Sequence, residues 1–327
     1  MNELIGGFSA QLEESIRISD NYQLKLDRTI TNCVICGLGG SGIGGEIVKQ
    51  WVQNSVSIPV EVCHGYLLPG YVDKTTLVIA CSYSGNTEET LTTVKQALTK
   101  EAFILAISGG GELKEIAQDN GFQLIQVPGG LPPRAALAYP LVQLVEIFEQ
   151  LKLTKSPIKK SILTSIQLLR SGETEITNLA KTLLKQASGK QILFYSEDQF
   201  APVLLRACQQ INENGKELAN YNVIPEMNHN EIVGWANSKA NLFVIVVRSS
   251  LEYIRNKQRL DITASLIQEK AESIEVFAKG DDLVEQSLFL IHLFDWLSYF
   301  LAEEKGIDVI EVKVIDYLKD SLAKSIQ

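Results

Sequence analysis

The chain has 327 residues, which is long enough for about two domains. Hydrophobic residues make up 45% and charged residues 21%, as is typical of a globular protein with a sizeable core. The net charge of −9 argues against a general nucleic-acid-binding or membrane-binding surface. The first twenty residues lack the basic and apolar segments of a signal peptide, and no apolar run reaches membrane-spanning length. The sequence therefore predicts a cytoplasmic protein.

The first half of the chain alternates apolar strands with amphipathic helices. We expect strands over residues 31–39, 58–65, 75–83, 102–110 and 122–128. Helices are expected over residues 42–54, 87–100, 112–120 and 134–151. Continuous apolar strands that alternate with helices indicate a parallel sheet covered on both faces.

The same scheme restarts after a long helical tract at 157–186. Strands are expected over residues 190–197, 240–249 and 273–280. Helices are expected over residues 201–215, 259–271, 283–306 and 314–325. The sequence thus predicts an α/β protein with two tandem halves of similar layout, and we place the domains at 1–153 and 154–327.

The cysteines raise the question of a redox or metal site. Cys33 and Cys36 form a CxxC pair, and Cys63, Cys81 and Cys208 are scattered. The pair lies in an apolar strand, where its side chains would face opposite sides, and no second CxxC completes a zinc site. We therefore expect reduced, buried thiols.

Histidines and acids give no better metal site. His229 with its neighbours Glu226 and Glu231 lacks the ligand spacing of a helical site and has no cysteine partner. We expect no metal.

Two loops rich in glycine and hydroxyl groups follow neighbouring strands. They read "GLGGSG" at 37–42 and "SYSGNT" at 82–87. Such residues can simply cap helices, but hydroxyls and free N–H groups at helix starts also bind anions. Two such loops at one sheet edge favour a single phosphate monoester. The expected contacts are Gly40, Ser41, Ser82, Ser84 and Thr87.

The first loop also supports a rival hypothesis. Gly37, Gly39 and Gly42 match the GxGxxG fingerprint, and Glu61 stands near the spacing of a ribose-binding acid. A nicotinamide-dependent enzyme is therefore an alternative. It is disfavoured because a dinucleotide fold needs one pyrophosphate loop, not two aimed at one point.

Longer motifs carry a family resemblance. "GLGGSGIGGEI" followed by "CSYSGNTEET" resembles the sugar isomerase (SIS) fold, a phosphosugar-binding module. "VPGGLPPRAALAY", "INENGKELANYNVIPEMNHNEIVGW" and "DVIEVKVIDYLKDSL" are similar to segments of the bifunctional phosphoglucose/phosphomannose isomerases, in the same order and over nearly the whole chain. The resemblance implies two tandem SIS-type domains, each a mostly parallel sheet between helical layers. It also implies a cofactor-free isomerase that converts glucose 6-phosphate, and mannose 6-phosphate, into fructose 6-phosphate.

The resemblance assigns roles to four residues. Glu213 is implied to be the base that moves a proton between C2 and C1, with Glu217 as a competitor that fits the motif less well. Arg134 is implied to stabilise the enediolate, and Lys319 to lie near the substrate. His229 is implied to reach the active site from the other subunit of a homodimer and to help open the sugar ring.

The residues themselves add to these assignments. His229 is in a polar, loop-like setting, whereas His64 ends a strand and His292 lies in an apolar helix that suits a core histidine. Arg134 is expected in the first turn of a helix, where a positive charge is unfavourable, so a functional reason for it is indicated.

Two further functions are weighed within the same fold. A non-catalytic phosphosugar-binding regulator would carry a DNA-binding domain, for which the short acidic N-terminal segment leaves no room. An amino-sugar isomerase would carry a glutamine-hydrolysing domain with an N-terminal cysteine, which this sequence does not show.

Overall fold

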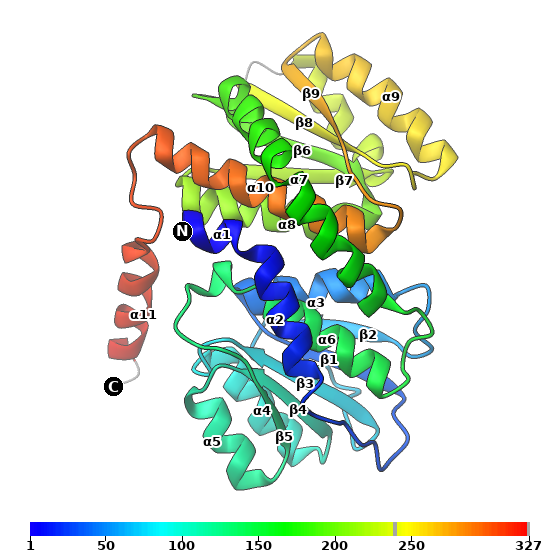
Figure 1. Ribbon diagram of the computed structural model, residues 1–327, viewed down its shortest axis with the longest axis vertical. Coiled ribbons are helices and arrows are strands. Elements are labelled where there is room, and N and C mark those ends of the chain that lie inside the picture. The colour runs from blue at the N-terminus through cyan, green and yellow to red at the C-terminus, as the bar shows by residue number, and fades with distance from the viewer. Residues whose placement is uncertain (238–240, 326–327) are drawn as a thin grey trace.

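The computed structural model describes residues 1–237 and 241–325. It contains two parallel sheets, one above the other in Figure 1. The first sheet has the order β2-β1-β3-β4-β5. Its strands are β1 (Asn32–Cys36), β2 (Val60–Cys63), β3 (Thr76–Ser82), β4 (Phe103–Ser108) and β5 (Gln123–Gln126).

Helices cover both faces of the first sheet. They are α2 (Phe8–Ser19), α3 (Gly39–Val52), α4 (Glu88–Thr99), α5 (Gly111–Asn120) and α6 (Ala138–Gln150), whereas α1 (Asn2–Gly6) lies against α10 (Leu283–Glu304) of the second half. Cys33 and Ile35 of β1 pack into the cluster formed with α2, α3 and α6, whereas Val34 and Cys36 belong to a cluster on the opposite face, with Ala97 of α4. Burial on both faces explains the continuous apolar strands, and it confirms that Cys33 and Cys36 face opposite sides.

The second sheet has the order β7-β6-β8-β9. Its strands are β6 (Gln191–Glu197), β7 (Ala219–Ile224), β8 (Leu242–Arg248) and β9 (Glu272–Phe277). The helices of this half are α7 (Ile158–Ala187), α8 (Ala201–Gln210), α9 (Ile254–Gln268), α10 (Leu283–Glu304) and α11 (Lys313–Ser325). Helix α9 packs on one face of the sheet, and α8 and α10 lie on the other.

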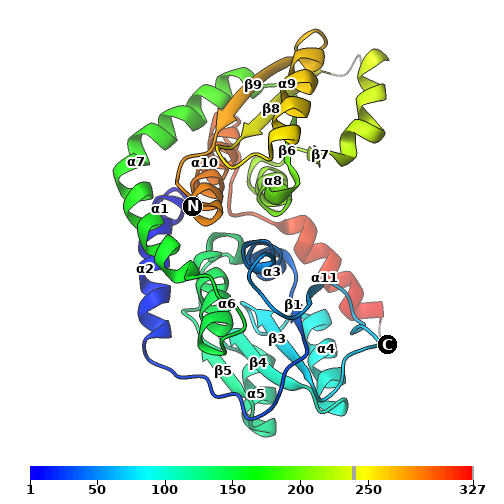
Figure 2. The ribbon, with the colours of Figure 1, turned by 90° about the vertical axis from the view of Figure 1, so that its right-hand side faces the viewer.

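One apolar cluster runs from the first sheet to the second. It joins Ile35 of β1 and Leu144 of α6 to Leu204 of α8, Leu293 of α10 and Phe194 of β6. Figure 2 shows α3 and α6 facing α8 and α10 between the two sheets. The inner helices of the two halves therefore form a single core.

The predicted alternation of strands and helices is confirmed, and the main differences are as follows. Strand β7 was not predicted, because its sequence "ANYNVI" has two asparagines and it lies at a sheet edge. Helices α1 and α2 were not predicted either. Helix α6 begins four residues later than predicted and α9 five residues earlier. Ala240, the first residue of one predicted strand, lies outside the described residues.

Helix α11 differs from the others because nearly all of it is exposed. It stands clear of the body in Figure 1 and presents Val314, Tyr317 and Leu318 to solvent. Within residues 1–237 and 241–325, none of the helices combines the length and the apolar character needed to span a membrane.

Candidate active site

The first glycine-rich loop leads from β1 directly into α3. Gly40 lies so close to the next segment that a Cβ atom there would stand 2.8 Å from the carbonyl oxygen of Pro133. Ser41 is buried, and its Oγ accepts a 3.3 Å hydrogen bond from the backbone N–H of Tyr83. Because Tyr83 belongs to the second loop, this bond fastens the two predicted loops together.

The second loop leaves the start of α4 open. Thr87 is the N-cap residue of α4, yet its side chain does not cap the helix. Its Oγ1 lies 2.8 Å from Oγ of Ser82 instead, and Ser84 is exposed at the tip of the loop. The first N–H groups of α4 therefore keep their partial positive charge beside three hydroxyls, which is a suitable site for an anion.

A third loop, 108–111 after β4, supports the second one and was missed in the sequence. Gly85 has a φ of +73°, and a Cβ atom there would stand 1.7 Å from the carbonyl oxygen of Gly110. Oδ1 of Asn86 accepts the N–H of Glu112 at 2.9 Å, near the start of α5. The letters "SGGG" at 108–111 were a signal, but they fell within and beyond the end of a predicted strand.

Arg134 does not lie at the start of α6. It belongs to a short 3-10 turn, Pro133–Ala135, while α6 begins at Ala138. The prediction that this arginine opposes the positive end of a helix is therefore wrong, because the turn directs its side chain away from α6 and into the C-terminal half. The side chain is only 5% exposed, so its charge needs partners.

The partners of Arg134 all come from the C-terminal half. Nη1 lies 3.1 Å from Oε1 of Glu213, and Nε donates to Oδ1 of Asn214 at 2.7 Å. Nη2 donates to the carbonyl oxygens of Val309 and Ile310, at 2.7 and 3.2 Å. The two residues predicted to be the base and the oxyanion stabiliser thus touch each other, although 79 positions separate them in the chain.

Glu213 sits in a π-helical turn, Ile211–Gly215, that continues α8. Such turns are rare and frequently mark functional sites. Its carboxylate is one third exposed and lines a cavity of about 300 Å³ between this turn and the start of α11. Glu217 lines the same cavity, but its carboxylate is paired with Lys305. Glu213 is therefore the carboxylate that contacts Arg134 and also meets solvent.

A histidine borders the first loop and was not predicted to contribute. Nδ1 of His64 lies 3.0 Å from the carbonyl oxygen of Gly37, and Nε2 lies 3.1 Å from Oε1 of Glu46. The hydrogen bond to the Glu46 carboxylate raises the pKa of His64, and the same bond lowers the pKa of Glu46. A histidine–glutamate pair therefore flanks the loop expected to bind phosphate.

Two predicted residues lie apart from this group in the single chain. His229 is exposed at the end of a short turn, Glu226–His229, and Figure 2 shows residues 226–237 at the outer side of the second sheet, far from α3 and α6. Lys319 is exposed on α11. His292, in contrast, is buried with Nε2 2.6 Å from Glu173, which confirms the prediction of a core histidine.

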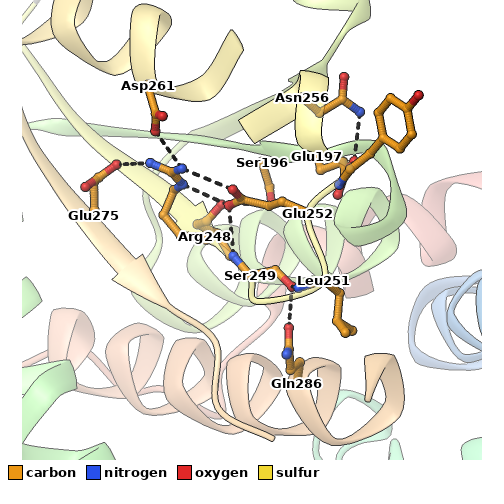
Figure 3. Close-up of polar contacts among 12 residues, drawn as sticks. Ser196, Glu197, Arg248, Ser249, Leu251, Glu252, Asn256, Asp261, Glu275 and Gln286 are labelled. Carbon is orange, nitrogen blue, oxygen red and sulfur yellow. Dashed lines mark hydrogen bonds and ion pairs between the residues drawn. The ribbon is translucent and has the colours of Figure 1, made fainter. Parts of the chain in front are cut away.

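The corresponding strand ends of the second sheet are built differently (Figure 3). Arg248 ends β8, is 5% exposed and donates to both carboxylate oxygens of Glu252, at 2.8 and 3.0 Å. Glu252 also accepts the N–H of Ser249 at 2.9 Å. Glu197, which ends β6, accepts the N–H of Tyr253 at 3.0 Å, just before α9. Internal carboxylates thus occupy the loop before α9, although α9 itself, like α3 and α4, begins without a side-chain cap.

Comparison with known proteins decides the family. The chain is 38% identical to the bifunctional phosphoglucose/phosphomannose isomerase of Caldicellulosiruptor bescii, over 99% of both proteins. The chain belongs to this family. Another member, from Aquifex aeolicus, is 35% identical over 89% of the chain and 90% of the relative. The resemblance drawn from the sequence motifs is confirmed.

The C-terminal half of the chain also matches a model of a phosphoglucose isomerase domain. Residues 176–322 match the model of the "Bacterial phospho-glucose isomerase C-terminal SIS domain". The fold is shared with a hypothetical protein from Thermus thermophilus, with a TM-score of 0.80 at 15% identity over 99% of the chain and 90% of that structure. An α/β fold of parallel sheets flanked by helices, as predicted, is therefore common to the chain and its structural neighbours.

Proposed function

We propose that this chain interconverts glucose 6-phosphate and mannose 6-phosphate with fructose 6-phosphate through an enediol(ate). The observation that carries the proposal is the 3.1 Å contact between Glu213 and Arg134, which stands directly beside Gly40 of the first loop. A carboxylate that can accept a proton and a buried cation that can stabilise an oxyanion are two groups that this reaction needs. Membership of the family supports the choice of substrates.

The phosphate group would bind at the two joined loops. Ser41, Ser82, Ser84 and Thr87 supply hydroxyls, and the starts of α3 and α4 supply backbone N–H groups near Gly40. The partial positive charge of these helix starts can attract a phosphate even though the whole chain carries a net charge of −9. The phosphate would hold the sugar with its C1 and C2 towards Arg134 and Glu213.

Proton transfer would be the work of Glu213. Its carboxylate takes the proton from C2, a negative charge develops on O1, and the Nη1 side of Arg134 stabilises that charge. Glu213 then returns the proton to C1, the hydroxyl proton of O2 passes to O1, and the C2 oxygen becomes the ketone. Glucose 6-phosphate and mannose 6-phosphate differ only at C2 and give the same planar enediol, so one base serves both epimers if it reaches either face.

Ring opening would require a second subunit. His229 is exposed and far from the first-sheet loops within one chain, and a partner in a homodimer can supply it. A neutral imidazole can carry a proton between the ring oxygen and O1. The exposed apolar side chains of α11 are consistent with a partner surface, and Lys319 on this helix would lie near the substrate.

The domain organisation belongs to the same proposal. We infer two tandem SIS-type domains at 1–153 and 154–327, supported by the two parallel sheets and by the family match in the second half. The enzyme would work in the cytoplasm, without metal or organic cofactor.

The Glu213→Gln variant tests the proposal. We expect it to lose about 10³-fold or more in turnover, because general-base catalysis contributes on the order of 10² to 10⁴. Phosphosugar binding, followed by calorimetry, should persist since the loops are intact. Turnover is measured by coupled detection of fructose 6-phosphate from each hexose phosphate, with and without EDTA. Glu217→Gln is the matched control and should retain activity.

Other outcomes separate the alternatives. Wild-type turnover in Glu213→Gln would show that Glu213 is not the base. Tight phosphosugar binding without turnover in the wild-type protein would indicate a regulator, and enhanced NADH fluorescence would indicate the nicotinamide enzyme.

Mixing two inactive variants tests the shared site. In a dimer of Glu213→Gln with His229→Ala, one site lacks both groups and the other has both. Random mixing should therefore restore about a quarter of the wild-type rate. No recovery would mean that each chain uses its own His229.

A further inference from the structure

Arg134 is held at both ends by one turn of α10. Its guanidinium donates through Nε to Asn214, which is fully buried. Nδ2 of Asn214 donates to Oγ of Ser298 at 3.0 Å, and that hydroxyl donates to the carbonyl oxygen of Asp295 at 2.7 Å. A chain of hydrogen bonds thus leads from the guanidinium to the backbone of α10.

A second chain returns from the same turn to the backbone of Arg134. Oδ2 of Asp295 lies 2.6 Å from Nη2 of Arg206, and Oδ1 accepts from Gln210 at 3.0 Å. Nη2 of Arg206 also donates to the carbonyl oxygen of Arg134 at 3.1 Å. The two chains close a ring, in which every side chain is at least nine-tenths buried.

The types of residue in this ring suit an arginine that must stay charged. Asn214 takes the Nε hydrogen with a neutral amide oxygen, so it orients the guanidinium without neutralising it. A carboxylate at this place would compete with Glu213 for the same charge. With the Val309 and Ile310 carbonyls on Nη2, the bonds found in the described part of the chain leave one Nη1 hydrogen for a further acceptor.

We propose that Asn214 and Ser298 are positioning residues for Arg134, which fix its free Nη1–H beside Glu213 where the substrate oxygen develops charge. The inference rests on the proposed function, because it assigns these residues to the same site. They act through Arg134 and do not touch the substrate. Preorganised donors matter because a small misplacement is costly in catalysis.

The experiment compares single and double variants of the two positioning residues. We expect Asn214→Ala to lower kcat by about ten- to a hundred-fold and Ser298→Ala by a smaller factor, since a misplaced catalytic group can cost that much. KM should change less than about two-fold, because the phosphate loops are untouched. The double variant should lose no more than Asn214→Ala alone, since both residues act along one chain of hydrogen bonds.

Ser287→Ala is the matched control. Ser287 is a buried serine of the same α10 helix, and its hydroxyl also accepts a side-chain hydrogen bond, from Nε1 of Trp51 in the first half at 3.2 Å. A merely structural role would make Ser287→Ala and Ser298→Ala lose equal activity for equal loss of thermal stability. The proposal predicts a loss of kcat in Ser298→Ala alone.

The outcomes separate this inference from the proposed function. If Glu213→Gln is inactive while Asn214→Ala and Ser298→Ala keep full kcat, only the positioning role is overturned. Equal effects of the two serine variants, or additive losses in the double variant, also overturn it. An inactive wild-type protein would overturn the inference together with the proposed function.

Discussion

The two sheets end in opposite ways at their carboxyl edges. At the first sheet, the loops after β1 and β3 present neutral hydroxyls, and α3 and α4 begin without side-chain caps. At the second sheet, Glu252 and Glu197 accept the N–H groups of Ser249 and Tyr253 in the loop before α9, and Arg248 balances Glu252 (Figure 3). The same layout is thus open to an outside anion in one half and filled by the protein's own carboxylates in the other.

This difference teaches what makes a strand end a binding site. Helix starts at a parallel sheet edge attract negative charge in either half. An internal carboxylate satisfies that demand permanently and stabilises the fold. Only an edge left with hydroxyls and open N–H groups retains its affinity for a ligand.

Removing Arg248 should give the largest effect on stability. Arg248→Met leaves the carboxylate of Glu252, which is 3% exposed, without its cation, and breaks the contacts to Asp261 and Glu275 as well. Breaking one partner of a buried pair costs about 3–5 kcal/mol, so we expect a loss of this size in urea unfolding. Arg255→Met, on the exposed surface of α9, is the control and should change stability little. A loss below that of the control would contradict the view that this edge is filled by a structural ion cluster.

Ser84→Ala should weaken ligand binding without changing the stability of the fold. Ser84 is two residues beyond the end of β3, and Ser250 is two residues beyond the end of β8; both are exposed. Loss of one hydrogen bond to a charged group costs about 1.5–3 kcal/mol, so fructose 6-phosphate should bind roughly ten- to a hundred-fold more weakly. Calorimetry on Ser84→Ala and Ser250→Ala compares the two edges directly. Equal losses would mean that the second edge binds the sugar phosphate as well.

The His64–Glu46 pair should produce the smallest effect. Because the pKa of His64 is raised in the folded state, the histidine contributes fully to stability below its ordinary pKa of 6.5. This contribution is lost as the pH rises through the raised pKa. The lowered pKa of Glu46 makes its contribution present above 4.5 and lost as the pH falls. The pair therefore stabilises the first edge most between these two pH values.

Unfolding measurements on His64→Gln can detect the pH-dependent stabilisation by the His64–Glu46 pair. Since the His64 side chain is 48% exposed, we expect at most about 0.5 kcal/mol after solvent screening. The difference in stability between pH 5.5 and pH 8 should shrink in the variant, and high salt should reduce it in the wild-type protein. If the variant shows the same difference in stability between the two pH values as the wild-type protein, the pair does not stabilise this edge.

Local patterns in the sequence predicted much of the fold and the position of the two hydroxyl-rich loops. The runs around Val34, Val78 and Val244 are apolar because both faces of each strand are buried, so they stand out without any tertiary information. Strand β7 does not stand out in the sequence, because it lies at a sheet edge and its polar residues face solvent or side chains such as Glu231. The start of α6 was placed too early because the turn at 133–135 is defined by its contacts with Gly40 and the C-terminal half.

The contacts of the site were less predictable. Glu213 and Arg134 could be named from motifs, but their ion pair joins distant segments. Asn214, Arg206 and Asp295 carry no local signal, because each acts only through partners that the fold brings near. Loops that function through their own backbone can be predicted from sequence, whereas networks between elements cannot.

The continuous apolar cluster between the sheets has a mechanical consequence. Swinging the halves apart would separate Arg134 from Glu213 only by wetting Leu144, Leu204 and Leu293, which are fully buried. Domain hinge bending is therefore a costly way to admit a sugar. A sugar would reach Glu213 more cheaply through the cavity between the π-helical turn and the start of α11, which already meets solvent.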